Sequence, residues 1–134
     1  MHSKGDWWTD GLSPFQNDGL SVYNTATMAS NDSSAYFTGV TALSGFFHDR
    51  VVLSPGSTEH ANWSDGEPLL ASKGNVIGVN FFPVDSPNVL SNWHPTGDYQ
   101  QLFINAITDD LSEGKRALRR PRQRLRPDIG GRRR

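Results

Sequence analysis

The clearest pattern of apolar and polar positions lies in residues 74–111. Residues 76–82 form an almost wholly apolar run that is short, rich in β-branched and aromatic side chains, and free of strict polar alternation. Such a run is typical of a strand that is covered on both faces. A loop that ends at residues 92–95 follows, and then a segment with a longer period. We therefore predict a buried strand that leads into a helix, as at the end of an α/β layer.

The segment 98–111 has the pattern of an amphipathic helix. Apolar side chains recur there with a period of about 3.6 residues, at Tyr99, Leu102, Phe103, Ala106 and Ile107. Asp98 and Gln101 have the spacing of a capping box, and Gly114 is typical of a helix end. The pattern predicts a helix that packs on the strand at 76–82.

Weaker signals upstream predict several short strands, and the candidates are residues 35–40, 50–54, 59–63 and 67–71. Ser64-Asp65-Gly66 separates the last two, and Asp-Gly between extended segments is a strong signal for a β-hairpin. In contrast, residues 1–34 are rich in small polar side chains and have no sustained period. We expect these residues to form an irregular lead-in.

Charge divides the chain into two unequal parts. Up to Gly114 it has three cations and thirteen carboxylates, whereas residues 115–134 have ten cations and one carboxylate. The basic segment has two prolines and few apolar side chains, so it buries too little surface to offset the entropy of ordering. We predict a disordered basic tail over residues 114–134. Arginine-rich arms bind nucleic acid, but we do not expect this here, because the tail lacks aromatic side chains for base stacking.

Composition also excludes several classes of protein. The chain has no cysteine, which excludes disulfides, a thiolate nucleophile and cysteine-ligated metals. No run approaches the roughly 18 apolar residues of a membrane span, and the N-terminal residues lack the apolar stretch of a signal peptide. We expect no membrane span. The chain would be extracytoplasmic as part of a longer exported protein, and cytoplasmic otherwise.

The loop after the strand at 76–82 is the first candidate for a binding site, because ligands of open α/β sheets bind beyond the carboxyl ends of the strands. A sugar would suit this loop, since an aromatic face packs on a pyranose while amides and carboxylates bond its hydroxyls. The predicted ligand-binding residues are Asn80, Asp85, Asn92, Trp93, His94 and Asp98. The alternative is a structural role, in which Trp93 packs over the helix and the asparagines form turns.

Catalytic and metal sites have less support. Two neighbour pairs join a histidine to a carboxylate, His48-Asp49 and Glu59-His60, and with His94 they could form a metal site or an acid–base pair. Adjacent residues of a strand point to opposite faces, so neither pair converges on one ion without a bulge. Asp85 and Asp98 form the carboxylate pair nearest to one crevice, but their spacing does not fix their separation. We expect no metal, no cofactor and no catalytic residue.

Five segments have the order and spacing of a known family. They are Gly11-Leu-Ser-Pro-Phe15, residues 37–45, Ala61-Asn-Trp-Ser-Asp-Gly-Glu-Pro-Leu-Leu70, Val76-Ile-Gly-Val-Asn-Phe-Phe-Pro83, and residues 93–107. Over residues 11–108 the chain resembles the C-terminal part of bacterial class I glutamine amidotransferase-like domains, of the trehalose-utilisation type. Each segment is a weak motif alone, so the resemblance lies in their order.

The resemblance implies an α/β fold: a flavodoxin-like three-layer fragment with a short mixed sheet, a β-hairpin excursion and a C-terminal helix. The partial domain would span residues 35–113, between the lead-in and the tail, and its first βαβ units would precede Met1. A missing N-terminal half of the domain, or a partner subunit, would complete the sheet. No catalytic residue is carried over, because the cysteine nucleophile of such enzymes is absent.

We therefore predict a non-catalytic amidotransferase-like module that binds carbohydrate or another small polar ligand at the loop after the central strand. Two alternatives stay open. The first is an extracytoplasmic β-rich carbohydrate-binding module to which the helix is an appendage. The second is a sugar-processing hydrolase, which would need catalytic residues that the sequence does not reveal.

Overall fold

One antiparallel sheet and one long helix make up the protein in a computed structural model that describes residues 11–82 and 95–119. The sheet has six strands in the order β5-β4-β3-β1-β2-β6. They are β1 (Phe15–Asn31), β2 (Leu43–Leu53), β3 (Thr58–Trp63), β4 (Pro68–Lys73), β5 (Val76–Val79) and β6 (Thr96–Gly97). A short 3-10 helix, η2 (Ala35–Phe37), connects β1 to β2, and α1 (Tyr99–Arg119) follows β6.

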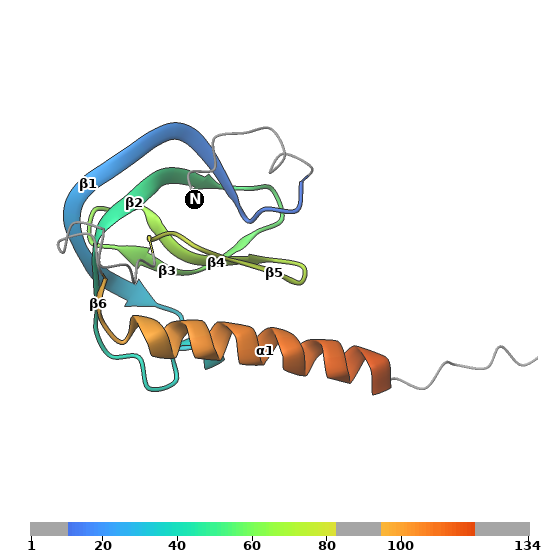
Figure 1. The fold of residues 1–134 in the computed structure, drawn as a ribbon. Helices are drawn as coiled ribbons and strands as arrows, with labels where there is room; N and C mark the ends of the chain where they lie inside the picture. The colour runs from blue at the N-terminus through green and yellow to red at the C-terminus, as the bar shows by residue number, and fades with distance from the viewer. Residues whose placement is uncertain (1–10, 83–94, 120–134) are drawn as a thin grey trace, which may run out of the picture.

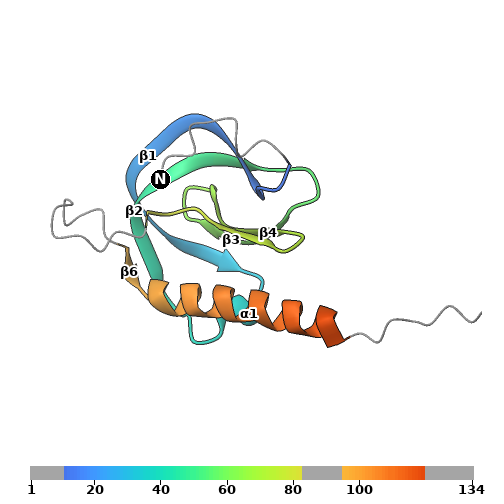
Figure 2. The ribbon, with the colours of Figure 1, turned by 45° about the vertical axis from the view of Figure 1, so that its right-hand side comes forward.

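The sheet curls because β1 is long and irregular. Residues 15–27 of β1 pair with β2, and residues 28–31 pair with β3. Register shifts interrupt β1 three times, and such bulges bend a strand and increase its twist; they fall between residues 17 and 21, 23 and 26, and 28 and 30. The result is a curled half-barrel, and α1 lies along one open end of it, next to η2 (Figures 1 and 2).

The predicted flavodoxin-like α/β fold is therefore wrong. Every strand pairing in the described part of the chain is antiparallel. Parallel strands would need long crossover connections, usually helical, whereas tight turns join β3 to β4 and β4 to β5. The sheet is not mixed, and the helix does not form one layer of three.

The apolar run at 76–82 misled the prediction because only its first four residues form a strand, and that strand lies at the edge of the sheet. Only Val76–Val79 form a strand, β5, which pairs with β4 alone and is half-buried at the edge of the sheet. A Cβ atom on Gly78 would lie 2.6 Å from the Pro14 side chain and 2.7 Å from that of Phe15. The segment that leads into β1 thus covers one face of β5. This cover explains an apolar sequence on an edge strand.

Several predicted elements are confirmed and others are wrong. The helix and the β3–β4 hairpin around residues 64–66 are confirmed, and residues 50–53 belong to β2. The irregular lead-in is wrong for Phe15–Asn31, which form β1, and residues 35–37 are a 3-10 helix instead of a strand. The helix continues past Gly114 to Arg119, so the disorder predicted for residues 114–119 is also wrong.

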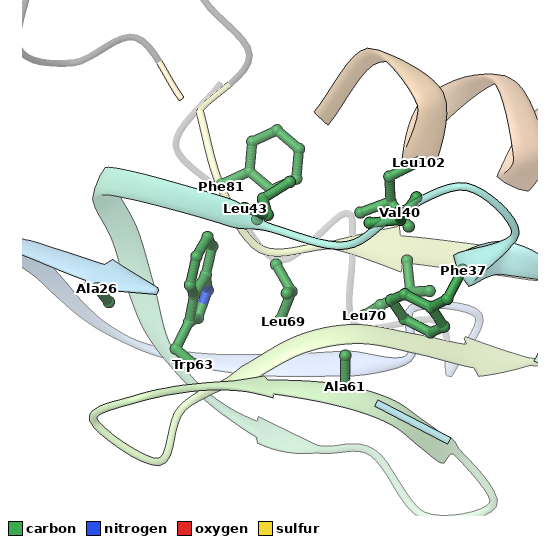
Figure 3. Packing of buried hydrophobic residues seen from close by; sticks show 10 residues of the cluster. All are labelled: Ala26, Phe37, Val40, Leu43, Ala61, Trp63, Leu69, Leu70, Phe81 and Leu102. Atoms are coloured by element: carbon green, nitrogen blue, oxygen red, sulfur yellow. The ribbon is translucent and has the colours of Figure 1, made fainter. Parts of the chain in front are cut away.

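The core lies between the concave face of the sheet, η2 and α1 (Figure 3). Trp63, Leu69, Leu70 and Leu102 are fully buried in it. The indole Nε1 of Trp63 donates a 2.9 Å hydrogen bond to the backbone oxygen of Asn80, which ties β3 to the segment after β5. The helix packs on this same segment, because the rings of Phe103 and Phe81 meet edge to face at 5.3 Å. Docking of the helix on the 76–82 run is thus confirmed.

Candidate functional site

Two of the six predicted ligand-binding residues lie in the described part of the chain. Asp85, Asn92, Trp93 and His94 lie outside the described residues, so their role as ligand-binding residues stays a prediction. Asn80 and Asp98 are described, and they occupy different places: the side chain of Asn80 binds the backbone of β2 and β4, whereas that of Asp98 binds the loop before β2.

Asn80 is a buried polar link between strands. Its Oδ1 accepts a 2.9 Å hydrogen bond from the backbone N–H of Asp49, and its Nδ2 donates 2.8 Å bonds to the backbone oxygens of Asp49 and Pro68. The residue is 6% exposed. Because the amide pairs with both the backbone N–H and the backbone C=O of Asp49, it holds this residue in place, as a neighbouring strand would.

Asp98 holds the start of the helix against the loop before β2. Its Oδ2 accepts hydrogen bonds from the backbone N–H groups of Thr41 and Ala42, at 2.8 and 3.1 Å, and from the Thr41 hydroxyl at 3.0 Å. The bonds from the Thr41 and Ala42 backbone, then that from the hydroxyl, lower the pKa of Asp98 below its ordinary value. The predicted capping box is wrong, since the side chain of Gln101 binds Asn105 instead.

One face of the β1–β2 pair combines an exposed aromatic ring with polar side chains. Tyr23 and Phe47 are direct cross-strand partners, and their rings meet edge to face at 4.9 Å. Two positions along, Ser21 pairs with Asp49, and the Ser21 hydroxyl donates a 2.8 Å bond to the Asp49 carboxylate. Residues two apart on a strand share a face. Tyr23 is 56% exposed, and we call Tyr23, Ser21 and Asp49 the Tyr23 surface.

Phe47, the cross-strand partner of Tyr23, also contacts Phe82, the last described residue before the predicted binding loop. The backbone N–H of Phe82 donates to the Phe47 oxygen at 3.3 Å, and the two rings meet edge to face at 5.8 Å. Asn80 fixes the backbone of Asp49 from the other side. Sequence reasoning missed Tyr23 and Ser21, because it assigned them to an irregular segment. Their two-residue spacing was the signal that pointed to a strand.

A second group of polar side chains lies at the β3–β4 turn. His48 is buried on β2, and its Nε2 lies 2.7 Å from the carboxylate of Asp65 in the turn. The Glu67 carboxylate accepts a 2.9 Å bond from the backbone N–H of Val51. The His48 ring stacks at a tilt on Trp63, with centroids 5.4 Å apart. These contacts clamp the hairpin onto β2, which is a structural use of the histidine.

A third group aligns three side chains, from the residue after β1, from β3 and from β4. The Asp32 carboxylate lies 2.6 Å from His60 Nδ1, and His60 Nε2 lies 2.7 Å from the Ser72 hydroxyl. Burial raises the pKa of Asp32, but hydrogen bonds from His60 and Ser34 outweigh it, so the pKa lies below its ordinary value. Sequence reasoning considered His60 with Glu59 and His94 and missed both Asp32 and Ser72, because they are distant from it in sequence.

Within residues 11–16, 19–82 and 95–109, whose side chains are described, no group of three histidine or carboxylate side chains is arranged to hold a metal ion. The described stretches also contain no helix with both the length and the apolar character needed to cross a membrane. Comparison with known proteins found no match, whether to family models, to curated proteins or to solved structures.

Proposed function

We propose that this protein is a β-rich module that binds carbohydrate, or another small polar ligand with an apolar face, at the Tyr23 surface. Binding there involves no chemical step. The observation that carries the proposal is the exposed ring of Tyr23 beside the hydrogen-bonded Ser21–Asp49 pair.

The chemistry of this surface suits a sugar ring. The apolar face of a pyranose packs on an aromatic ring, and hydroxyls around the sugar need acceptors and donors at fixed positions. Tyr23 offers the ring, the Asp49 carboxylate offers an acceptor, and the Ser21 hydroxyl offers both functions. Asn80 holds the Asp49 backbone through two bonds, so the acceptor is positioned before a ligand arrives, which lowers the entropy cost of binding.

The resemblance to glutamine amidotransferase-like domains stays a proposal about ancestry. The flavodoxin-like fold that it implied is wrong and is not part of this proposal. The antiparallel sheet favours the β-rich binding module. The sugar hydrolase loses support for a separate reason. Asp98, one of the two carboxylates that it would have used, is held by three hydrogen bonds from residues 41 and 42.

Glycan binding by Tyr23 variants tests the proposal. We expect the full chain to bind at least one member of a glycan array, and Tyr23→Ala to weaken that binding at least about tenfold, as loss of a central aromatic contact does. Asp49→Asn should also weaken binding, because it removes the charge of the acceptor while leaving the backbone bonds to Asn80.

Val52→Ala is the matched control. Val52 lies on β2 and is 63% exposed, but it is not part of the Tyr23 surface, so its loss should leave binding unchanged. Thermal unfolding of each variant checks that the fold is intact. Failure of the wild-type chain to bind any glycan, or an equal loss in Val52→Ala, would overturn the proposal.

A further inference from the structure

A hydrogen-bonded line of three side chains crosses the sheet from the end of β1 to β4. Asp32 directly follows β1, His60 lies on β3 and Ser72 lies on β4. These strands are neighbours in the sheet. The two distances along the line, 2.6 Å from the carboxylate to Nδ1 and 2.7 Å from Nε2 to the hydroxyl, are those of strong hydrogen bonds. We propose that Ser72, His60 and Asp32 are a nucleophile, a general base and its positioning carboxylate for the hydrolysis of carboxylic esters.

A bulge in β3 turns His60 into this line. Glu59 pairs with Ala71 and Ala61 pairs with Leu70, so His60 is an extra residue without a partner of its own on β4. Bulges of this kind re-aim a side chain, and they are over-represented beside active sites. Sequence reasoning had excluded binding of one ion by both Glu59 and His60 unless such a bulge existed.

The backbone around Asp32 holds its carboxylate in place. Its Oδ1 accepts a 3.0 Å bond from the Ser34 N–H, and its Oδ2 faces His60. The Asp32 N–H donates to the His60 oxygen at 2.8 Å. Ser33, which lies between Asp32 and Ser34, has a φ of 58°, and it is the one residue other than glycine with a positive φ in the described chain. Backbone strain of this kind persists only where the surroundings enforce it.

The helix stabilises the imidazole through η2. Tyr36 packs edge to face on the His60 ring with centroids 4.9 Å apart, and Asn105 of α1 donates 2.8 Å bonds to the backbone oxygens of Tyr36 and Thr38. The helix therefore holds η2 in place, and Tyr36 of η2 holds the His60 ring. A base that is held on two sides keeps the geometry that proton transfer requires.

The proton positions follow from the partners. An ionised carboxylate only accepts hydrogen bonds, so neutral His60 carries its proton on Nδ1. Nε2 is then the acceptor, and the Ser72 hydroxyl must donate to it. This is the tautomer in which an imidazole removes the proton of a serine hydroxyl, and the carboxylate stabilises the resulting imidazolium without being protonated itself.

The reaction proceeds in two balanced halves. The Ser72 Oγ attacks the ester carbonyl carbon while its proton passes to His60 Nε2, and the C–O bond to the leaving alcohol then breaks as that alcohol takes the proton. Water attacks the acyl-Ser72 and gives a proton to Nε2, and Ser72 recovers that proton as the acid leaves. Nothing is oxidised or reduced, and no cofactor is needed.

The line is open to a substrate at its rim. The side chains of His60 and Asp32 are 12% and 39% exposed, and Ser72 is partly exposed. The base is therefore mostly shielded from water, while the nucleophile is within reach. This site involves none of the residues of the Tyr23 surface. Failure of one proposal would therefore leave the other unaffected.

Covalent labelling of the full chain with a fluorophosphonate tests the proposal directly. We expect a phosphonylated Ser72, located by mass spectrometry of proteolytic peptides, and hydrolysis of p-nitrophenyl acetate that is lost in Ser72→Ala. His60→Gln should slow labelling at least about 100-fold, the usual contribution of a general base. An intact fold by circular dichroism accompanies each comparison.

Asp32→Asn separates positioning from structural support. The amide would favour the wrong imidazole tautomer, so kcat for the acetate ester should fall while KM is unchanged, and Asp32→Glu should restore part of it. Ser30→Ala is the control, because the Ser30 hydroxyl binds an amide, that of Asn62, at 2.6 Å. No adduct on Ser72 of the folded wild type, or equal labelling in His60→Gln, would overturn the proposal.

Discussion

At the scale of single residues, polar side chains do structural work in places where sequence reasoning expected ligand contacts. Asn80 was predicted to bind a ligand, yet its side chain makes three hydrogen bonds to backbone atoms of β2 and of the residue that begins β4. A buried amide must satisfy its donors and acceptors, and backbone groups that miss a strand partner satisfy them well. An asparagine at a strand end can serve either purpose, so its type alone could not decide.

We predict that Asn80→Ala lowers the free energy of unfolding by about 2–4 kcal/mol, because it leaves buried backbone groups without partners. Urea denaturation measures this change. Asn62→Ala is the comparison, since Asn62 accepts one exposed bond from Ser30, and it should cost under about 1 kcal/mol. Equal effects of the two substitutions would contradict the structural role of Asn80.

At the scale of elements, sequence patterns predicted the helix and the β3–β4 hairpin well and the remaining strands poorly. The helix has a strong period, and Asp65-Gly66 is a strong local turn signal. In contrast, β1 has bulges that break the two-residue alternation, and β5 is apolar because Pro14 and Phe15 cover it. Both effects depend on contacts between distant segments, which the local pattern does not contain.

The helix depends on a narrow apolar stripe. Leu102 is fully buried, whereas Ile107, predicted to share its stripe, is 61% exposed. We predict that Leu102→Ala lowers the free energy of unfolding by about 2–5 kcal/mol, through lost burial and a residual cavity. Ile107→Ala should change it by under about 0.5 kcal/mol, as at other exposed positions. Chemical denaturation of both variants checks this, and a large effect of Ile107→Ala would show that the stripe is wider.

Asp98 couples the helix to the loop before β2, and its charge makes this coupling sensitive to acid. The folded-state pKa lies below the ordinary value of 3.8, so the unfolded chain binds the proton more readily. The stabilisation is present above pH 3.8 and is lost as the pH falls through the folded-state pKa. We predict that Asp98→Asn flattens the acid limb of the stability curve, measured by urea midpoints from about pH 5 to about pH 2.

Thr41→Ala is the matched control for this acid dependence. It removes the hydroxyl bond at 3.0 Å but keeps both backbone bonds to Asp98. The acid limb should therefore become only slightly shallower. An acid limb in Asp98→Asn as steep as that of the wild type would show that other carboxylates cause the dependence.

At the scale of the whole molecule, both candidate sites join residues that are far apart in the chain. Ser21 meets Asp49, and Asp32 meets His60 and then Ser72. Each of these residues is unremarkable in its own segment. The sequence could suggest that histidines and carboxylates were available, but only the curl of the sheet and the bulge at His60 decide which of them meet.

The long strand β1 also determines how the protein unfolds. Thr27 pairs with Ser44 of β2, and its backbone oxygen also accepts a 2.8 Å bond from Ser64, at the end of β3. A single segment is therefore the seam of both halves of the half-barrel. Neither half keeps its hydrogen-bonded edge when the other opens, so the two should melt together, and the amides beside this seam should exchange with solvent only when the whole sheet unfolds.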